Sequence, residues 1–373
     1  MIETLLDAPQ GTGQAVRMLL RSLLEKKIVD ALLLPVRMPG ASVAPALVRD
    51  PALVDNSAPL APVMPINAAR AVQALTITGH RQKLGVVLRS CEIRALVELT
   101  KFQQAKLDDV VIVGVDCLGT YGVEVWHQAP DKQALIDGLL ASAGDGNLVP
   151  AHGLAFRSAC QICEQPVPTG DHVALTVGLL GVEPGTLFLH ARDDIAHALD
   201  LSASTTPPRR AQAIKSLTDA RIAARDLAFA SYRTRVDSIQ GLLAEFGPCI
   251  RCHNCMTNCP ICYCRECIFR TPTFEHDSEL LYQWAERKGS VRLLPDTLLF
   301  HLTRLNHMVT SCVGCGMCTE ACPAGIDVGT VFRAVGDKVQ ALFDYHPGRS
   351  LAEAAPVQEF REDELKTLGE RPH

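Results

Sequence analysis

The sequence predicts an α/β domain at the N-terminus, then a helical connector, and then a mostly helical domain rich in cysteine. Short apolar runs alternate with helical patterns in the first part of the chain, and this alternation is typical of α/β domains. The pattern then changes to one long polar helix or helix pair, which two regularly spaced cysteine runs follow. The predicted boundaries are an α/β domain at 1–205, a connector at 206–246, a cysteine-rich domain at 247–345 and a charged tail, expected to be mobile, at 346–373.

Within the α/β domain, short segments rich in Val, Leu and Ile indicate buried strands. They lie at residues 29–36, 84–88, 109–115 and 186–190. Helical patterns occupy residues 14–27, 67–78 and 92–104. Pro and Gly interrupt residues 38–65 throughout, so we expect a surface loop there.

The composition argues against several classes of partner. A net charge of −5 and an aromatic content of 5% provide neither the basic surface nor the stacking platform that nucleic acid requires. The best apolar stretch, residues 28–36, is broken by Asp30 and Pro35, so no membrane span is predicted. The N-terminus lacks the basic start and apolar core of a signal peptide. We therefore expect a cytoplasmic protein whose 15 cysteines bind metal rather than form disulfides.

Two cysteine runs carry the strongest chemical signal in the chain. Each has the spacing C-x2-C-x2-C-x3-C and is followed by a proline, Pro260 or Pro323. This spacing is that of bacterial two-cluster ferredoxins, in which the fourth cysteine of each run binds the other cluster. The domain is therefore predicted to be ferredoxin-like and to transfer electrons. Its predicted ligand sets are Cys249, Cys252, Cys255 and Cys322 for one 4Fe–4S cluster, and Cys312, Cys315, Cys318 and Cys259 for the other.

The segment between the two runs is too long for a compact small ferredoxin. It contains two helical patterns, at residues 278–288 and 296–310, and Pro295 and Asp296 form a plausible capped start for the second. We therefore expect the largely helical type of two-cluster ferredoxin domain.

Four more cysteines lie in the α/β domain. Cys91 and Cys117 each follow a predicted strand, and Cys160 and Cys163 form a C-x2-C pair. Ligand sites of open α/β sheets gather at the carboxyl ends of strands, so these four thiols could hold one more cluster. On spacing alone, the alternative is equally good: Cys91 and Cys117 are buried packing residues, and Cys160 and Cys163 bind zinc.

Several stretches resemble one family, the β subunits of coenzyme F-420-dependent hydrogenases and formate dehydrogenases. In the α/β domain they are LLEKKIVDALLLP, PVMPINAARAV, SCEIRALVEL, IVGVDCLGTYG and SACQICEQPVP. The stretches CIRCHNCMTNCPICYCREC and LPDTLLFHLTRLNHMVTSCVGCGMCTEACP are specific to the formate dehydrogenase branch. The resemblance covers roughly residues 10–345. It implies a mixed sheet of the flavin- and cluster-binding type, with a third 4Fe–4S cluster on Cys91, Cys117, Cys160 and Cys163.

The resemblance also implies FAD, although its site departs from the family pattern. The family has Gly-Gly-x-x-Thr before the first helix, where this chain has Gly13 followed by Gln-Ala-Val and Arg17. Gly11, Thr12 and Gly13 could let the backbone approach the pyrophosphate, and Arg17 could pair with it. Asn67, in a second resembling stretch, is a further candidate, whereas GDHVALTVGLLG has lost its family pattern. The alternatives are a plain turn before a helix, and a relay of iron–sulfur clusters without flavin.

Three cysteines stand outside these sets: Cys262, Cys264 and Cys267. Three thiolates are one short of a complete ligand set. The fourth ligand could be His253, His276, a cysteine borrowed from a neighbouring set or a residue of another subunit. One of the three could instead replace Cys259, or all three could simply pack near a cluster. His301 and His307 are expected to be surface or supporting residues rather than ligands.

The resemblance implies an electron-transfer β subunit of a cytoplasmic formate dehydrogenase, because the chain shows no recognisable catalytic set of its own. Formate oxidation would occur on a partner α subunit with a molybdenum or tungsten molybdopterin cofactor. Electrons would pass through the two ferredoxin-like clusters and the third cluster to FAD. The acceptor could be the deazaflavin coenzyme F-420, a ferredoxin, a nicotinamide system or a heterodisulfide-reductase-like partner. The alternatives are the same subunit serving a nickel–iron hydrogenase or a bifurcating complex, and a zinc-stapled assembly module.

Overall fold

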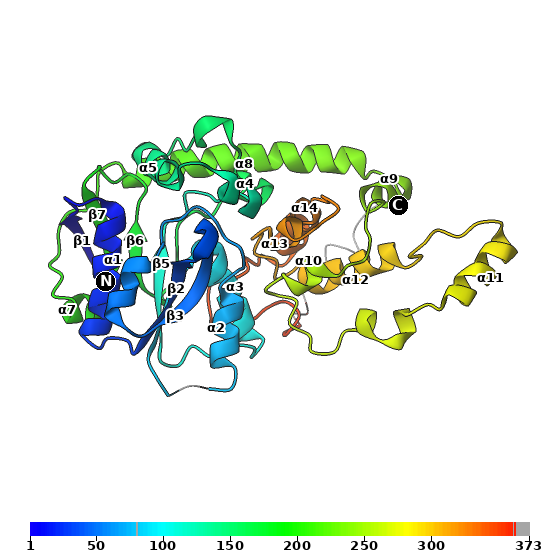
Figure 1. The fold of residues 1–373 in the computed structure, drawn as a ribbon, viewed down its shortest axis with the longest axis horizontal. Helices are drawn as coiled ribbons and strands as arrows, with labels where there is room; N and C mark the ends of the chain where they lie inside the picture. The colour runs from blue at the N-terminus through cyan, green and yellow to red at the C-terminus, as the bar shows by residue number, and fades with distance from the viewer. Residues whose placement is uncertain (80, 361, 363–373) are drawn as a thin grey trace.

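A seven-stranded mixed sheet forms the centre of the N-terminal part (Figure 1). The computed structural model describes residues 1–79, 81–360 and 362. The order of strands is β1-β7-β6-β5-β4-β2-β3. The strands are β1 (Ile2–Asp7), β2 (Ala31–Arg37), β3 (Val43–Val48), β4 (Leu84–Arg89), β5 (Val110–Val115), β6 (Val173–Gly178) and β7 (Thr186–Ala191).

Four central strands are parallel, and the antiparallel strands lie towards the edges. β2, β4, β5 and β6 run in one direction, while β3 and β7 pair antiparallel to their neighbours. The mixed sheet is the one that the family resemblance implies. Because the four parallel strands end at one edge, the segments that follow them meet there.

All four predicted strands form, and the structure adds β1, β3 and β6. The expected loop at 38–65 is wrong in part, because it contains β3. Pro45 of β3 pairs with Pro35 of β2, and two prolines in register offer no N–H to a ladder. β3 tolerates this as the last strand of the sheet, the position where proline is allowed.

Helices cover both faces of the sheet and create two apolar cores. α1 (Thr12–Glu25) and α5 (Lys132–Ser142) belong to the first core, and α2 (Ala69–Thr76) and α3 (Ser90–Lys101) to the second. Strand β2 supplies both: Leu32 and Leu34 face the first core, whereas Leu33 faces the second. This alternation follows from the two-residue period of a strand. Three short helices complete this part: α4 (Val123–Gln128), α6 (Ser158–Gln161) and α7 (Asp193–Ala198).

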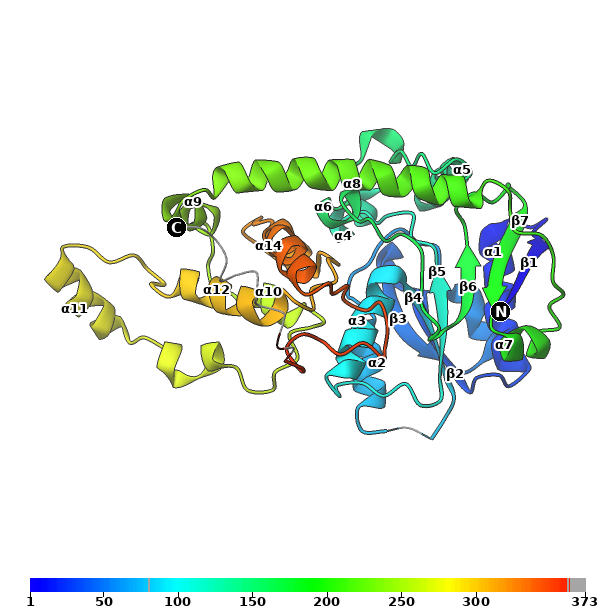
Figure 2. The same ribbon diagram turned by 180° about the vertical axis from the view of Figure 1, so that it is seen from behind.

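The predicted connector is a helix pair, α8 (Arg210–Arg235) and α9 (Ile239–Glu245). Figure 1 shows α8 extending from the sheet to a position beside α14 (Val328–Leu342), and Figure 2 shows the same from behind. Ala213 and Leu217 are buried in the first core, while Phe229 and Tyr232 are buried in the second. The connector therefore packs against both parts of the chain and is more than a solvated helical face.

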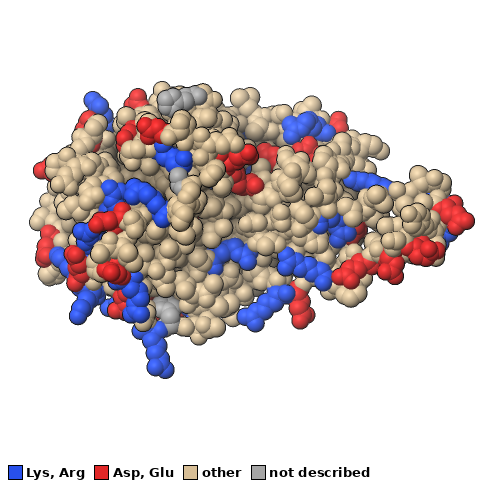
Figure 3. Space-filling view, in the orientation of Figure 1, with Lys and Arg blue, Asp and Glu red and all other residues tan. Residues whose placement is uncertain are grey.

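The C-terminal part is mostly helical, as expected. It contains α10 (Asn254–Thr257), α11 (Ser278–Lys288), α12 (Thr297–Met308), α13 (Met317–Glu320) and α14. The two helices predicted between the cysteine runs are α11 and α12. No residue of α11 is buried, and Figures 1 and 2 show this helix projecting from the body. Acidic side chains gather on that projecting end in Figure 3, whereas both signs of charge are interspersed elsewhere on the same face.

The first part of the tail is packed rather than mobile. Glu98 of α3 has a fully buried side chain. Its Oε1 accepts hydrogen bonds from the Tyr345 hydroxyl (2.6 Å), the Gly348 amide (2.8 Å) and the Lys101 ammonium (3.2 Å). Further along, Gln358 donates to the carbonyl of Lys101 at 2.7 Å. The expected mobility is therefore wrong for the segment around these contacts, and residues 363–373 lie outside the described residues.

We predict that Glu98→Ala lowers the free energy of unfolding by about 3–5 kcal/mol, because the buried Lys101 ammonium loses its counter-charge. Denaturant unfolding followed by circular dichroism on anaerobically purified protein measures this. The control is Asp194→Ala, which removes an exposed ion pair with Arg192 and is expected to cost less than about 1 kcal/mol. Equal effects of the two substitutions would contradict the prediction.

Candidate electron-transfer site

The two cysteine runs fold into equivalent loops, each leading into a single-turn helix, α10 or α13. Arg251 and His253 in the first run have φ of +52° and +62°, and Gly314 and Gly316 at the matching positions of the second have +69° and +71°. These left-handed residues curl the backbone around the cysteines. The Arg251 amide donates to the Sγ of Cys249 at 3.3 Å, the kind of hydrogen bond that tunes a cluster ligand.

The fourth cysteine of each run lies among the first three of the other. Burial raises the pKa of Cys312, Cys315 and Cys318, and the charge of Cys259 is the next cause for each of them. The charge of Cys322 likewise contributes to the raised pKa of Cys249 and Cys255. The two runs are therefore interleaved in space, and the crossed ligand sets stay a prediction.

Arg304 and His301 of α12 contact the first set. The Arg304 guanidinium donates to the Sγ of Cys255 at 3.1 Å and to the carbonyl of the same residue at 3.1 Å. The His301 Nε2 lies 3.2 Å from the Sγ of Cys249. Burial lowers the pKa of His301 to about 3, so the imidazole is neutral. His301 thus lies beside a predicted cluster ligand, as the sequence suggested, but it is buried. No sequence pattern predicted the role of Arg304.

The four cysteines of the α/β part line one cavity. Cys91 lies in the first turn of α3, directly after β4, and Cys117 follows β5. The side chain of Glu92 fixes the start of α3 by accepting from the amides of Arg89 (2.9 Å) and Ala68 (3.0 Å). Cys160 and Cys163 come from α6 and the residues after it. Three segments distant in the sequence therefore meet at the carboxyl edge of the sheet.

Arg157 organises this cavity from its buried position beside Cys160. Its Nε donates to the Oγ1 of Thr120 at 2.8 Å, and its Nη2 lies 3.6 Å from the Sγ of Cys160. Burial acts to raise the pKa of Cys160, but Arg157 and Thr120 outweigh it and lower that pKa. Burial and the nearby Cys160 thiolate raise the pKa of Cys117 to about 11.

The lining of the cavity suits an anionic cluster. The guanidinium groups of Arg89, Arg157 and Arg221 line it together with the four thiols, and no carboxylate belongs to that lining. Four thiolates in a buried site need such compensating positive charge. Among the residues that the structure describes, no three His, Cys, Asp or Glu side chains converge on the position of a single metal ion.

The α/β cavity lies directly against the second cysteine run. Cys315 lines the cavity, and its charge contributes to the raised pKa of Cys91, after burial and the charges of Glu92 and Cys117. A Cβ added to Gly316 would lie 2.3 Å from the Cβ of Ala159 in α6. The two sets of thiols are thus neighbours. The ion pair of Arg333 with Glu164 at 2.7 Å joins the same two parts of the chain.

The structure does not bring the expected flavin residues into one cavity. Gly11 begins α1 with φ of +90° and lines a cavity of about 490 Å³. Arg17 donates to the Oε1 of Gln14 at 2.8 Å instead of lining that cavity. Asn67 is buried at the start of α2, where its Oδ1 accepts from the Ala69 amide at 3.1 Å. Thr12 and Gly13, in the first turn of α1, are not among the residues lining the cavity.

The remaining three cysteines, Cys262, Cys264 and Cys267, line a separate cavity beside α2 and α12. Neither histidine named as their fourth ligand lines it: His253 stacks on Phe300 with 4.8 Å between the ring centroids, and His276 packs against Trp284 at 5.3 Å. Met256, Arg304 and His307 do line this cavity.

Comparison with known proteins identifies the two cysteine runs as part of a dicluster domain. Residues 245–326 match the model of a 4Fe-4S dicluster domain. Over 372 residues, the chain is 26% identical to F420-dependent formate dehydrogenase subunit beta of Methanocaldococcus jannaschii, covering 90% of this chain and 92% of the relative. Over 369 residues, it is 25% identical to subunit beta of F420-dependent formate dehydrogenase 1 of Methanococcus maripaludis, covering 90% of each.

One solved structure is also similar. It is the F420-reducing [NiFe] hydrogenase complex of Methanosarcina barkeri, determined after xenon derivatization, one chain of which aligns at 11% identity with a TM-score of 0.40. The alignment covers 64% of this chain and 93% of that one. A TM-score this low does not establish a common fold.

The cysteine runs, the dicluster match and the α/β part together define an iron–sulfur electron-transfer protein. Over 90% of its length, the chain is similar to β subunits of F420-dependent formate dehydrogenases. Within the described residues, no helix is both long and apolar enough to span a membrane.

We predict that Cys117→Ser removes about four iron atoms per chain, the content of one cubane. The measurement is iron and sulfide per chain after anaerobic purification. Its control is Ser42→Cys, which adds an exposed thiol outside the cavity and should leave the iron content unchanged. Full iron content in the Cys117 variant would exclude that thiol as a ligand.

We also predict that Arg157→Gln makes the reduction potential of the adjacent cluster more negative, because a buried positive charge favours the reduced state. The expected shift is on the order of 60 mV, a tenfold change for a one-electron couple. A redox titration followed by electron paramagnetic resonance measures it. Arg157→Lys, which keeps the charge, should shift the potential less, and an unchanged potential in the Gln variant would refute the assignment.

Proposed function

We propose that this chain is the electron-transfer β subunit of a formate dehydrogenase complex, relaying electrons between a molybdenum or tungsten catalytic subunit and a soluble acceptor. One observation carries the proposal. Three sets of thiols lie in succession, with Cys315 shared between the lining of the α/β cavity and the second run. The names of the two relatives indicate formate as the donor and coenzyme F420 as the acceptor.

The residues of this chain would hold and tune the clusters. Bound 4Fe–4S clusters accept and release single electrons. The crossed sets, Cys249, Cys252, Cys255 and Cys322 with Cys312, Cys315, Cys318 and Cys259, would fix two of them in the ferredoxin-like part. The set Cys91, Cys117, Cys160 and Cys163 would hold the third. Buried guanidinium groups at Arg157 and Arg304 stabilise the thiolates.

FAD is the second part of the proposal. A flavin exchanges single electrons with clusters and a hydride with a two-electron acceptor, which a chain of clusters cannot do alone. The support is the family resemblance and the open backbone at Gly11, where an added Cβ would meet no atom within 4 Å. Gly11 is the one flavin candidate that we retain, because Asn67 does not line the cavity at Gly11.

The complex purified anaerobically through a tag on this chain tests the proposal. A large subunit containing molybdenum or tungsten should copurify, and formate should bleach the iron–sulfur absorbance as far as dithionite does. One flavin per chain is expected. The control is formate added to the tagged chain alone, which should bleach nothing. Bleaching by hydrogen but not by formate, with a nickel-containing partner, would replace this proposal with the hydrogenase alternative.

A further inference from the structure

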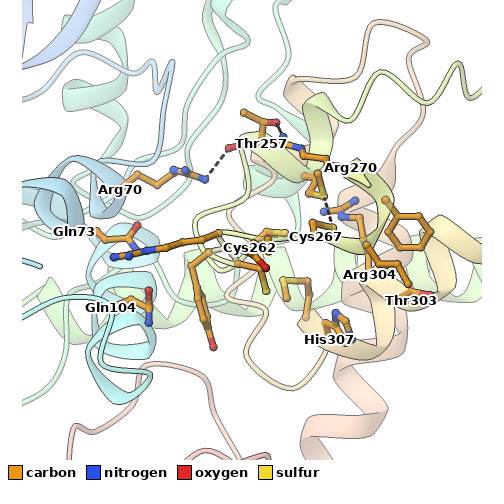
Figure 4. A pocket seen from close by; sticks show the side chains of 18 of the residues that line it. Arg70, Gln73, Gln104, Thr257, Cys262, Cys267, Arg270, Thr303, Arg304 and His307 are labelled. Atoms are coloured by element: carbon orange, nitrogen blue, oxygen red, sulfur yellow. Dashed lines mark hydrogen bonds between the residues drawn. The ribbon is translucent and has the colours of Figure 1, made fainter. Parts of the chain in front are cut away.

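Three cysteines remain without a role in the proposed relay. Cys262, Cys264 and Cys267 follow the first run in the spacing C-x-C-x2-C. All three line one cavity of about 440 Å³, to which α2 and α12 also contribute (Figure 4). This segment directly follows the first run. A hydrogen bond also holds it there, since the Cys262 amide donates to the carbonyl of Cys259 at 3.2 Å.

The three thiols are neighbours in space as well as in sequence. Burial raises the pKa of Cys262 to about 11, and the charges of Cys259, Cys264 and Cys267 contribute to the same shift. The Cys267 thiol lies 3.7 Å from the Sδ of Met256. The three cysteines of this short segment therefore border one cavity.

His307 completes this set. It lines the same cavity from the last turn of α12, and Figure 4 shows its ring beside the space that the Cys262 and Cys267 side chains border. A neutral imidazole is a normal ligand of iron in clusters that replace some cysteines by histidine. Three thiolates and one imidazole make four ligands.

The charges around the cavity favour an anionic occupant. Arg304 donates to the Sγ of Cys255 and also lines this cavity, so it lies between the first ligand set and the three thiols. The other charged residues of the lining are three arginines and one glutamate: Arg70, Arg265, Arg270 and Glu266. This excess of positive charge offsets the negative charge of thiolates.

The described residues show no single-ion site at this cavity. Zn–S bonds of about 2.3 Å would bring the sulfur atoms of one zinc site within about 4 Å of each other. Among the described residues, no three potential ligands converge in that way, here or in the two ferredoxin-like sets. A single zinc ion would therefore require these thiols to move closer together.

We propose that Cys262, Cys264 and Cys267 hold a further iron–sulfur cluster, with His307 as its fourth ligand, beside the first cysteine run. Cys264 is exposed, so this cluster lies at the surface, while Arg304 connects its cavity to the buried Cys255. The site extends the relay outward, where a single electron passes between it and a redox group of a partner. The inference goes beyond the proposed function and holds whichever catalytic subunit the chain serves.

Iron and sulfide analysis of the full chain, purified anaerobically, tests the inference. With this cluster the wild type should contain about 16 iron atoms, and Cys264→Ser about 12. Because Cys264 is exposed, its substitution disturbs little packing, and Cys267→Ser should give the same loss. His276→Gln, in the same segment but outside the cavity, is the control and should retain every iron atom.

Two further variants separate this site from the third cluster. The double variant Cys117→Ser/Cys264→Ser should lose about eight iron atoms, since each site holds one cubane. His307→Cys should retain the iron and change the electron paramagnetic resonance signal that Cys264→Ser removes. An unchanged iron content in Cys264→Ser overturns the inference while leaving the other clusters intact. One zinc per chain, lost in the same variant, overturns it as well.

Discussion

Contacts between buried guanidinium groups and cysteine sulfur are the interactions on which this architecture depends. Thiolates gathered in a buried site repel one another, and burial alone disfavours each charge. Arg157 beside Cys160 and Arg304 beside Cys255 supply the opposite charge at distances of 3.6 and 3.1 Å. Both also join separate parts of the fold, since Arg157 contacts Met317 of α13 and Arg304 lies on α12. The same side chains therefore compensate charge and hold segments together.

Both polar and apolar contacts join the α/β part to the C-terminal part. Arg94 of α3 donates to the carbonyl of Val313 in the second run at 2.8 Å, and Arg333 of α14 pairs with Glu164. Helix α8 adds apolar contacts to both parts through Leu217 and Phe229. Such a junction fixes the separation of neighbouring cysteine sets, and it explains why residues far apart in the sequence meet at the carboxyl edge of the sheet.

The sequence predicted those elements whose signal is local. Central strands such as β4 and β5 are continuous apolar runs, and the spacing of the cysteine runs is determined by the size of a cubane. The sequence does not reveal β3, because its prolines favour a loop, or β6, because Thr176 and Gly178 interrupt its apolar run. The arginines were not predictable in this way. Arg221 donates to the carbonyl of Leu118, 103 residues away, and no local sequence pattern predicts such a contact.

Gly316 shows how narrow the tolerance of this architecture is. Its φ of +71° disfavours any side chain, and a Cβ would collide with Ala159 of α6. The matching position of the first run, His253, has a similar φ of +62° yet carries a full side chain, which stacks on Phe300. The two cysteine runs repeat one spacing, but they thus tolerate different residues at this matching position. Among related chains, glycine at this position would mark those that keep the second run in contact with the α/β cavity.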